Sequence, residues 1–265
     1  MIRRLRTTTR TTKDTTMSTP LGIIGSGAIG GTLARLAIAA GLDVVLSNSR
    51  GPESLAAFVE QLGPRARAAT VRETAEQADV VIAAIPLIAH TDLPADALAG
   101  RIVLDTTNYY PQRDGRIAAL DDLESTASEL VQAHLADSSV VKAFNSITFA
   151  SLGNGARAAG DPERSTLPIA GEDAAAKARA TEILDALGYD ALDTGGLAES
   201  WRSEPGTPIY CDPYMPAWPA ETLPFDELLA WLLAAPVVPV SRERAAELIA
   251  SAVRGPAGGY FPETA

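Results

Sequence analysis

The chain has 265 residues, of which 46% are hydrophobic and 21% are charged, and it carries a formal net charge of −11. These proportions are typical of a soluble globular protein with room for one large domain and a smaller partner. The single cysteine, Cys211, excludes an intrachain disulfide and a multi-cysteine metal site, and this suits a reducing cytoplasm. No apolar run approaches the roughly 20 residues that cross a bilayer, so no membrane partner is expected.

The first sixteen residues differ in composition from the rest of the chain. They are rich in Thr and Arg, and five basic residues with one acid give them a charge of +4, so the remaining chain carries −15. Arg-rich, acid-poor leaders also occur in organellar transit peptides. We expect residues 1–17 to form a disordered extension, with Met17 as a second candidate initiator. The acidic remainder is a poor partner for phosphate backbones, which argues against nucleic-acid binding.

A glycine-rich turn follows the first apolar run. Residues 21–30 read LGIIGSGAIG, and an Ala- and Leu-rich helical pattern comes directly after them. A strand, a G-x-G-x-x-G turn and a helix in this order predict a dinucleotide site, with the diphosphate at the amino end of the helix. The residues predicted to bind the cofactor here are Gly25, Ser26, Gly27, Ala28, Ile29 and Gly30.

The second strand ends without an acidic residue. An NAD-specific site usually places Asp or Glu there, where the carboxylate accepts hydrogen bonds from the ribose 2′-hydroxyl. This chain instead has Ser47, Asn48, Ser49 and Arg50. Neutral donors and a guanidinium suit a 2′-phosphate, whereas a carboxylate would repel it. These residues therefore predict NADP as the cofactor; the alternative is a polar loop whose Arg faces solvent.

Alternating short apolar runs and helical patterns continue along the chain, and they predict a Rossmann-type α/β fold with a doubly wound parallel sheet. The expected strands lie near 21–25, 43–47, 67–70, 79–85, 101–105, 140–145, 167–171 and 189–193. The expected helices lie near 28–40, 52–62, 71–78, 88–99, 121–135, 173–187, 225–234 and 241–253. We assign residues 18–150 to an NADP-binding domain and 151–265 to a smaller C-terminal α/β or helical domain. The strands after 150 could instead extend the main sheet.

Polar and aromatic residues follow several of these strands, at the sheet edge where open α/β folds bind ligands. Ile85 and Pro86 suit the wall behind a nicotinamide ring, although Pro86 also serves as a strand terminator, and His90 is a further cofactor candidate or a plain first-turn residue. The second ligand is predicted to contact Asn108, Tyr109, Lys142, Phe144 and Asn145. Exposing adjacent tyrosines in the loop 106–115 would be costly without a purpose. Lys142 could instead be a buried ion-pair partner.

Several separate motifs between residues 20 and 208 resemble one known family. GSGAIG, SNSRGPES, VLDTTNYYPQRDG, VVKAFNSI and LAESWRSEPGTP together are similar to the NADPH-dependent F420 reductases, in wording typical of a bacterial subgroup. The resemblance implies a homodimer that moves a hydride directly between NADP and the deazaflavin coenzyme F420, without catalytic side chains or metal. It assigns Ser26, Ser49 and Arg50 to the NADP phosphates. It places Pro86, Asn108, Phe144 and Asn145 around the stacked rings.

Two other functions stay open from the residues alone. The first is an NADPH-dependent reductase of another acceptor, such as a flavin, quinone, imine or ketone. Reduction of a ketone or imine needs a proton donor, for which Lys142, Tyr109 or His90 are candidates. The second is a non-catalytic NADP-binding sensor, because a Rossmann scaffold by itself does not specify an activity.

Overall fold

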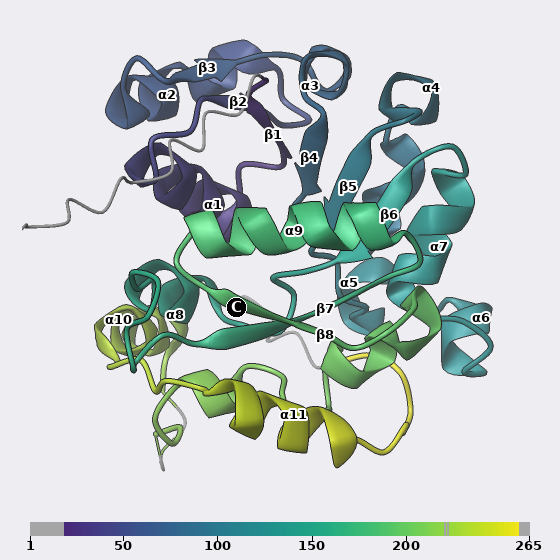
Figure 1. Ribbon diagram of the computed structural model, residues 1–265, viewed down its shortest axis with the longest axis vertical. Helices are drawn as coiled ribbons and strands as arrows, with labels where there is room; N and C mark the ends of the chain where they lie inside the picture. The colour runs from purple at the N-terminus through teal and green to yellow at the C-terminus, as the bar shows by residue number, and fades with distance from the viewer. Residues whose placement is uncertain (1–18, 220, 222, 260–265) are drawn as a thin grey trace, which may run out of the picture.

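The fold is described by a computed structural model that covers residues 19–219, 221 and 223–259, so the extension predicted for 1–17 lies outside the described residues. Its strands and helices alternate along the chain (Figure 1). The strands are β1 (Leu21–Ile24), β2 (Val44–Ser47), β3 (Ala66–Ala68), β4 (Val80–Ala83), β5 (Ile102–Asp105), β6 (Ser139–Lys142), β7 (Thr166–Gly171) and β8 (Asp190–Asp193). The α-helices are α1 (Ala28–Ala39), α2 (Ala56–Leu62), α3 (Val71–Gln77), α4 (Ala95–Leu98), α5 (Pro111–Asp114), α6 (Ala118–Asp121), α7 (Ala127–His134), α8 (Phe149–Asn154), α9 (Ala174–Ala186), α10 (Phe225–Ala234) and α11 (Arg242–Ala250). Four 3-10 helices are η1 (Pro52–Leu55), η2 (Leu87–Asp92), η3 (Leu197–Ser203) and η4 (Asp212–Tyr214).

All of these strands join one sheet, in the order β3-β2-β1-β4-β5-β6-β7-β8. The first six are parallel; β7 runs antiparallel to β6, and β8 runs parallel to β7. The order reverses direction between β1 and β4, which creates a crevice at the carboxyl ends of these strands. The predicted Rossmann-type, doubly wound fold is therefore confirmed.

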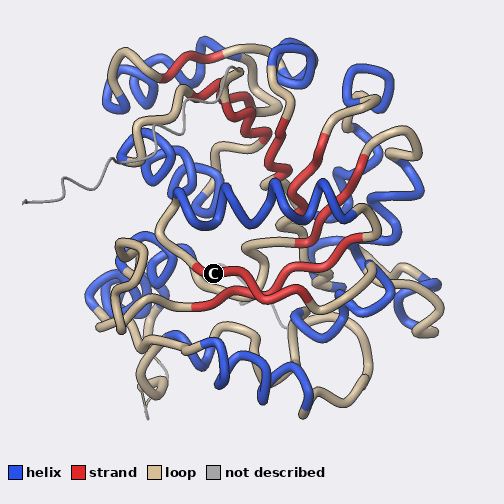
Figure 2. The backbone as a smooth tube through the Cα atoms, viewed as in Figure 1, coloured by secondary structure: helices blue, strands red, loops and turns tan. Residues whose placement is uncertain are grey.

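Helices cover both faces of this sheet (Figures 1 and 2). One face packs against α1, α2 and α9, and the opposite face packs against α3, α4 and α7. The strands β1, β2 and β4 are buried along their whole length, as the near-continuous apolar sequences of a parallel sheet require. The core is therefore two apolar layers separated by the sheet.

The strands after residue 150 extend the main sheet, which is one of the two arrangements that the sequence left open. Strand β7 adds to the edge of β6 through Lys142 and Ala170, and the apolar layer beneath α1 continues through α9 to α11. The boundary between domains at residue 150 stays a prediction.

Two predicted helices are broken in the structure. The pattern at 88–99 forms η2 and then α4, because Leu93 is extended (ψ 131°) ahead of Pro94, as residues before proline prefer. The pattern at 121–135 forms α6 and then α7, because Thr126 begins a new helix with a capping box to Glu129. Local capping and proline chemistry thus overrides the apolar periodicity.

Candidate functional site

The glycine turn between β1 and α1 has a backbone that only glycine fits well. Gly25 has φ of +108°, and a Cβ atom there would lie 2.1 Å from the carbonyl oxygen of Ala84. A Cβ on Gly30 would lie 1.9 Å from the carbonyl oxygen of Gly25, so Gly30 permits the close contact of helix and turn. A Cβ on Gly27 would meet nothing within 4 Å. Gly27 therefore faces open space, where the fingerprint places a diphosphate.

The amino end of α1 is open to an anion. Its N-cap residue, Gly27, makes no side-chain capping bond, and the first turn contains no acidic residue. Ala28 and Ile29 occupy this first turn, so their backbone N–H groups are among those without a partner inside the helix. These groups and the positive end of the helix dipole together suit a diphosphate.

A cavity of about 330 Å³ joins the glycine turn to the loop after β2 and the loop after β4. Its walls are Ile24, Gly25, Ser26, Gly27, Asn48, Ser49, Arg50, Val71, Ala84, Ile85, Pro86, Ala89, Asp92 and Leu93. The structure thus brings together three segments that the sequence analysis assigned to the cofactor. Val71 in α3, and Ala89, Asp92 and Leu93 in or directly after η2, also line the cavity and were not predicted.

Asn48 holds two walls of this cavity together. Its amide nitrogen donates to the hydroxyls of Ser26 at 3.2 Å and Ser54 at 3.0 Å, and its carbonyl oxygen accepts from the backbone N–H of Arg50 at 2.9 Å. Asn48 itself is 9% exposed. The side chain therefore positions the loop after β2 against the glycine turn, and this structural role was not foreseen from the sequence.

The other residues of this loop have different placements. Ser49 and Arg50 are exposed, and the Arg50 guanidinium has no carboxylate within 4 Å among the described residues. Ser47 is fully buried and does not line the cavity; its carbonyl oxygen accepts from the N–H of Gly25 at 2.9 Å. Contrary to the sequence-based expectation of a cofactor ligand, Ser47 supports the turn from behind.

His90 also lies apart from the cavity walls. Its Nδ1 lies 2.8 Å from the carbonyl oxygen of Leu87, and its ring meets that of His134 edge-on with centroids 6.0 Å apart. His134 in turn lies with Nε2 2.8 Å from the carbonyl oxygen of Leu93. The pair braces η2 against α7, and the cofactor contact of His90 stays a prediction.

Two asparagines meet at the ends of β5 and β6. The amide nitrogen of Asn108 donates to the carbonyl oxygen of Asn145 at 2.9 Å, and that of Asn145 donates to Asn108 Oδ1 at 3.2 Å. Asn145 also donates to the carbonyl oxygen of Ser203 at 2.7 Å, which ties η3 to the same point. Just before it, Phe144 is buried with φ of +61°, a left-handed conformation that costs about 1–3 kcal/mol for such a residue. The predicted meeting of these strand ends is thus present.

Lys142 lies beneath this edge and is fully buried. Its ammonium group is 3.4 Å from Asp105 Oδ2 and donates to the carbonyl oxygen of Thr107. Asp105 also accepts from Ser128 Oγ at 2.5 Å. The structure therefore has Lys142 as the buried ion-pair partner, the alternative to the predicted substrate ligand.

Tyr109 is also buried rather than exposed on its loop. Its hydroxyl donates to Asp121 Oδ1 at 3.0 Å and accepts from the N–H of Ile117 at 3.0 Å. Tyr109 belongs to the apolar core on the side of the sheet that α3 and α7 cover, so it has no exposed surface for the predicted contact with the second ligand. The neighbouring Tyr110 is only half-buried, and its hydroxyl pairs with that of Tyr210.

The described residues contain no cluster of three or more His, Cys, Asp or Glu side chains suited to a metal ion. They also include no helix long and apolar enough to cross a bilayer.

Comparisons with known proteins give results in agreement with this geometry. Residues 20–109 match the family model "NADP oxidoreductase coenzyme F420-dependent". A hypothetical protein of Sinorhizobium meliloti, SMa0349, has a solved structure with 30% identity and a TM-score of 0.63, covering 72% of this chain and 93% of that one. The structure of a putative F420-dependent NADP-reductase from Arthrobacter sp. FB24 has 23% identity and a TM-score of 0.59, covering 69% and 87% of the two chains, and shows the fold alone.

A curated relative is longer than this chain. The metalloreductase STEAP3 of Rattus norvegicus is 32% identical over 205 residues, which are 77% of this chain. The match spans 38% of the rat protein.

Proposed function

We propose that this chain, which matches an NADP oxidoreductase family model over residues 20–109, transfers a hydride between NADP(H) and the deazaflavin coenzyme F420. The observation that carries the proposal is that the open glycine turn and the acid-free loop of Ser49 and Arg50 line the same cavity. The F420 acceptor is supported by the family description over residues 20–109.

The chain's own residues account for the preference for NADP. The N–H groups at the amino end of α1 bind the diphosphate, and Gly27 leaves room for it. Arg50 neutralises the 2′-phosphate, and Ser49 supplies a neutral donor beside it. Asn48 keeps these groups in place without adding charge. NADPH, when bound, supplies the hydride, and Ile85 with Pro86 forms the apolar wall beside its ring.

Hydride transfer to the acceptor requires the two rings to be oriented and does not require acid–base catalysis. Holding two rings face to face contributes about 7–11 kcal/mol in well-oriented systems. Asn108 and Asn145 fix the strand ends at this edge, and Phe144 sits strained beneath them. Two of the three candidate proton donors are occupied elsewhere: Lys142 by Asp105 and Tyr109 by Asp121. This arrangement favours direct hydride transfer over reduction of a ketone or imine.

Stopped-flow mixing of the protein with NADPH and oxidised F420 tests the proposal, with FMN as an alternative acceptor and NADH as an alternative donor. We expect F420 reduction that is fast with NADPH and slow with NADH. NADPH binding with turnover of FMN alone would identify a reductase of another acceptor. NADPH binding with no turnover of either acceptor would identify a sensor.

A further inference from the structure

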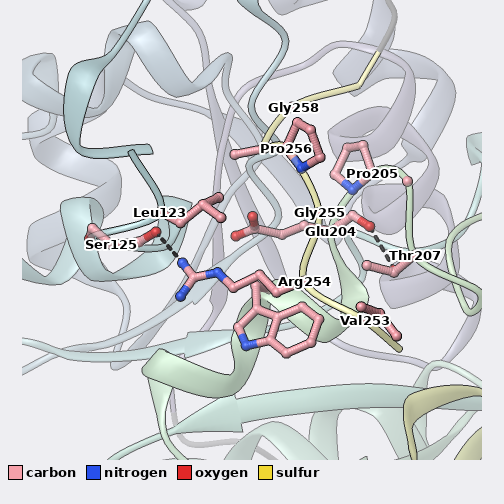
Figure 3. Close-up of a pocket in the computed structure, with 13 residues that line it drawn as sticks. Leu123, Ser125, Glu204, Pro205, Thr207, Val253, Arg254, Gly255, Pro256 and Gly258 are labelled. Atoms are coloured by element: carbon pink, nitrogen blue, oxygen red, sulfur yellow. Dashed lines mark hydrogen bonds between the residues drawn. The ribbon is translucent and has the colours of Figure 1, made fainter. Parts of the chain in front are cut away.

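A second cavity, of about 230 Å³, lies between η3, the loop before α7 and the segment that follows α11 (Figure 3). None of its lining residues lines the nucleotide cavity. Two groups of opposite charge, Glu204 and Arg254, face it. Apolar side chains, among them Leu123, Pro205 and Val253, complete its walls.

Glu204 brings a buried carboxylate to this cavity. The residue is 8% exposed, and its Oε1 accepts from the backbone N–H of Ala127 at 3.0 Å. Among the described residues, the N–H of Ala127 is the hydrogen-bond donor to this carboxylate. Burial raises the pKa of Glu204, because the charged form loses hydration. In Figure 3 the carboxylate points into the cavity. The positive charges of Lys142 and Arg254 offset part of this cost, and a ligand with a positive group would offset more of it.

Arg254 faces the same space with a positive charge. One guanidinium nitrogen donates to the carbonyl oxygen of Ser125 at 2.7 Å, and no carboxylate of the described residues lies within 4 Å of the group. Its Cζ lies 5.9 Å from the ring centre of Trp201, which also lines the cavity. In Figure 3 no hydrogen bond joins the guanidinium to the Glu204 carboxylate, although both residues line the cavity. Arg254 is therefore held in place with capacity left for an anion.

The two charges restrict what this cavity can accept. The carboxylate of Glu204 would repel an anion that has no positive group. The guanidinium of Arg254 would repel a cation that has no negative group. A molecule that carries both charges satisfies both residues, and its apolar part covers Leu123 and Val253. We propose that this cavity binds a small apolar α-amino acid as its zwitterion, with the carboxylate on Arg254 and the ammonium on Glu204. The inference goes beyond the hydride-transfer function and does not depend on it.

Isothermal titration calorimetry of the full chain tests the site with three probes: L-leucine, 3-methylbutylamine, which lacks the carboxylate, and 4-methylpentanoate, which lacks the ammonium. We expect L-leucine to bind at least about tenfold more tightly than either analogue, since a lost charge-assisted hydrogen bond costs that factor or more. Equal affinity for the three probes would overturn the proposal. So would the absence of leucine binding in a preparation that binds NADPH.

Variants assign the two ends of the ligand. Glu204→Gln and Arg254→Gln should each weaken L-leucine at least about tenfold and leave NADPH affinity unchanged. Arg202→Gln is the matched control, because Arg202 lies 4.5 Å from the Trp201 ring centre and pairs with Glu199, outside the cavity lining. Unchanged leucine affinity in the first two variants, or an equal loss in the control, would refute the assignment. Because this test measures only the binding of leucine and NADPH, its failure can be distinguished from a failure of the proposed hydride transfer.

Discussion

We expect Arg50 to be the residue that separates NADPH from NADH in this cavity. Its guanidinium is exposed beside Ser49 and has no carboxylate partner among the described residues, so its charge is free for a 2′-phosphate. Arg50→Ala should weaken NADPH by about 10–150-fold, which corresponds to about 1.5–3 kcal/mol for hydrogen bonds to a charged group. NADH affinity should stay nearly constant.

Titration of both nucleotides against the variant measures this difference. Arg65→Ala is the control, because Arg65 precedes β3 at the amino ends of the strands and pairs with Asp43 at 3.3 Å. An equal loss of NADPH and NADH affinity in Arg50→Ala would remove Arg50 from the phosphate site.

Two glycines of the same turn separate a cofactor effect from a folding effect. A methyl group on Gly27 meets no protein atom within 4 Å, so Gly27→Ala should keep the melting temperature and lose NADPH affinity. A methyl group on Gly30 collides with the carbonyl oxygen of Gly25, so Gly30→Ala should lower the stability by about 1–3 kcal/mol or more. Thermal unfolding with and without NADPH compares the two. Full NADPH affinity in a folded Gly27→Ala would show that the diphosphate lies elsewhere.

Glu204 makes stability depend on pH. Because burial raises its pKa above the ordinary 4.5, the folded chain holds this proton to higher pH than the unfolded chain. The contribution of Glu204 to the free energy of unfolding therefore falls as pH rises above 4.5 and is lowest above the raised pKa. Glu204→Gln removes this loss and should be more stable than the parent at about pH 7, by about 1–3 kcal/mol.

Urea unfolding across this pH range is the measurement, with Glu199→Gln as the exposed control. The gap between parent and Glu204→Gln should widen as pH rises. Curves that stay parallel would contradict the burial argument.

At the scale of elements, Lys142 joins β5 to β6 beneath the cleft. It shares a register position with Asp105 across the two strands, and both side chains are fully buried. Removing one partner of a buried pair leaves an uncompensated charge and costs about 3–5 kcal/mol. Lys142→Ala should show this loss in urea unfolding, whereas Lys177→Ala, at the half-exposed Asp193, should cost about 1 kcal/mol or less. Unchanged stability with lost turnover would restore Lys142 as a substrate ligand.

At the scale of the whole molecule, one sheet and one apolar layer run through both halves of the chain. The layer beneath α1 includes Leu21 near its start and Leu248 in α11. We therefore expect one cooperative unfolding transition, and saturating NADPH at 100 times its Kd should raise the free energy of unfolding by about 2.7 kcal/mol throughout. The three tryptophans, Trp201, Trp218 and Trp231, all report on the C-terminal half.

Tryptophan fluorescence and far-ultraviolet circular dichroism in urea compare the two halves. Their midpoints should coincide and shift together when NADPH is added. Separate midpoints, with only the circular dichroism shifted by NADPH, would support an independent domain after residue 150.

The sequence by itself determined the glycine turn, the acid-free end of β2 and the alternation of strands and helices, because each of these is written in residues close along the chain. It could not place Tyr109, Lys142, Ser47 or His90, since a strand end or loop does not state which way its side chains turn. Those directions depend on partners distant in sequence: Asp121 for Tyr109, Asp105 for Lys142 and His134 for His90.

Only the tertiary structure decided which residues share a cavity. Asp92 and Leu93 line the nucleotide cavity together with the glycine turn. Glu204 and Arg254, which are 50 positions apart in the chain, line the second cavity. Burial and charge pairing act through space, so the second cavity leaves no local pattern in the sequence. The predicted cofactor residues are therefore largely specified by short-range motifs, whereas the second cavity exists only once the chain has folded.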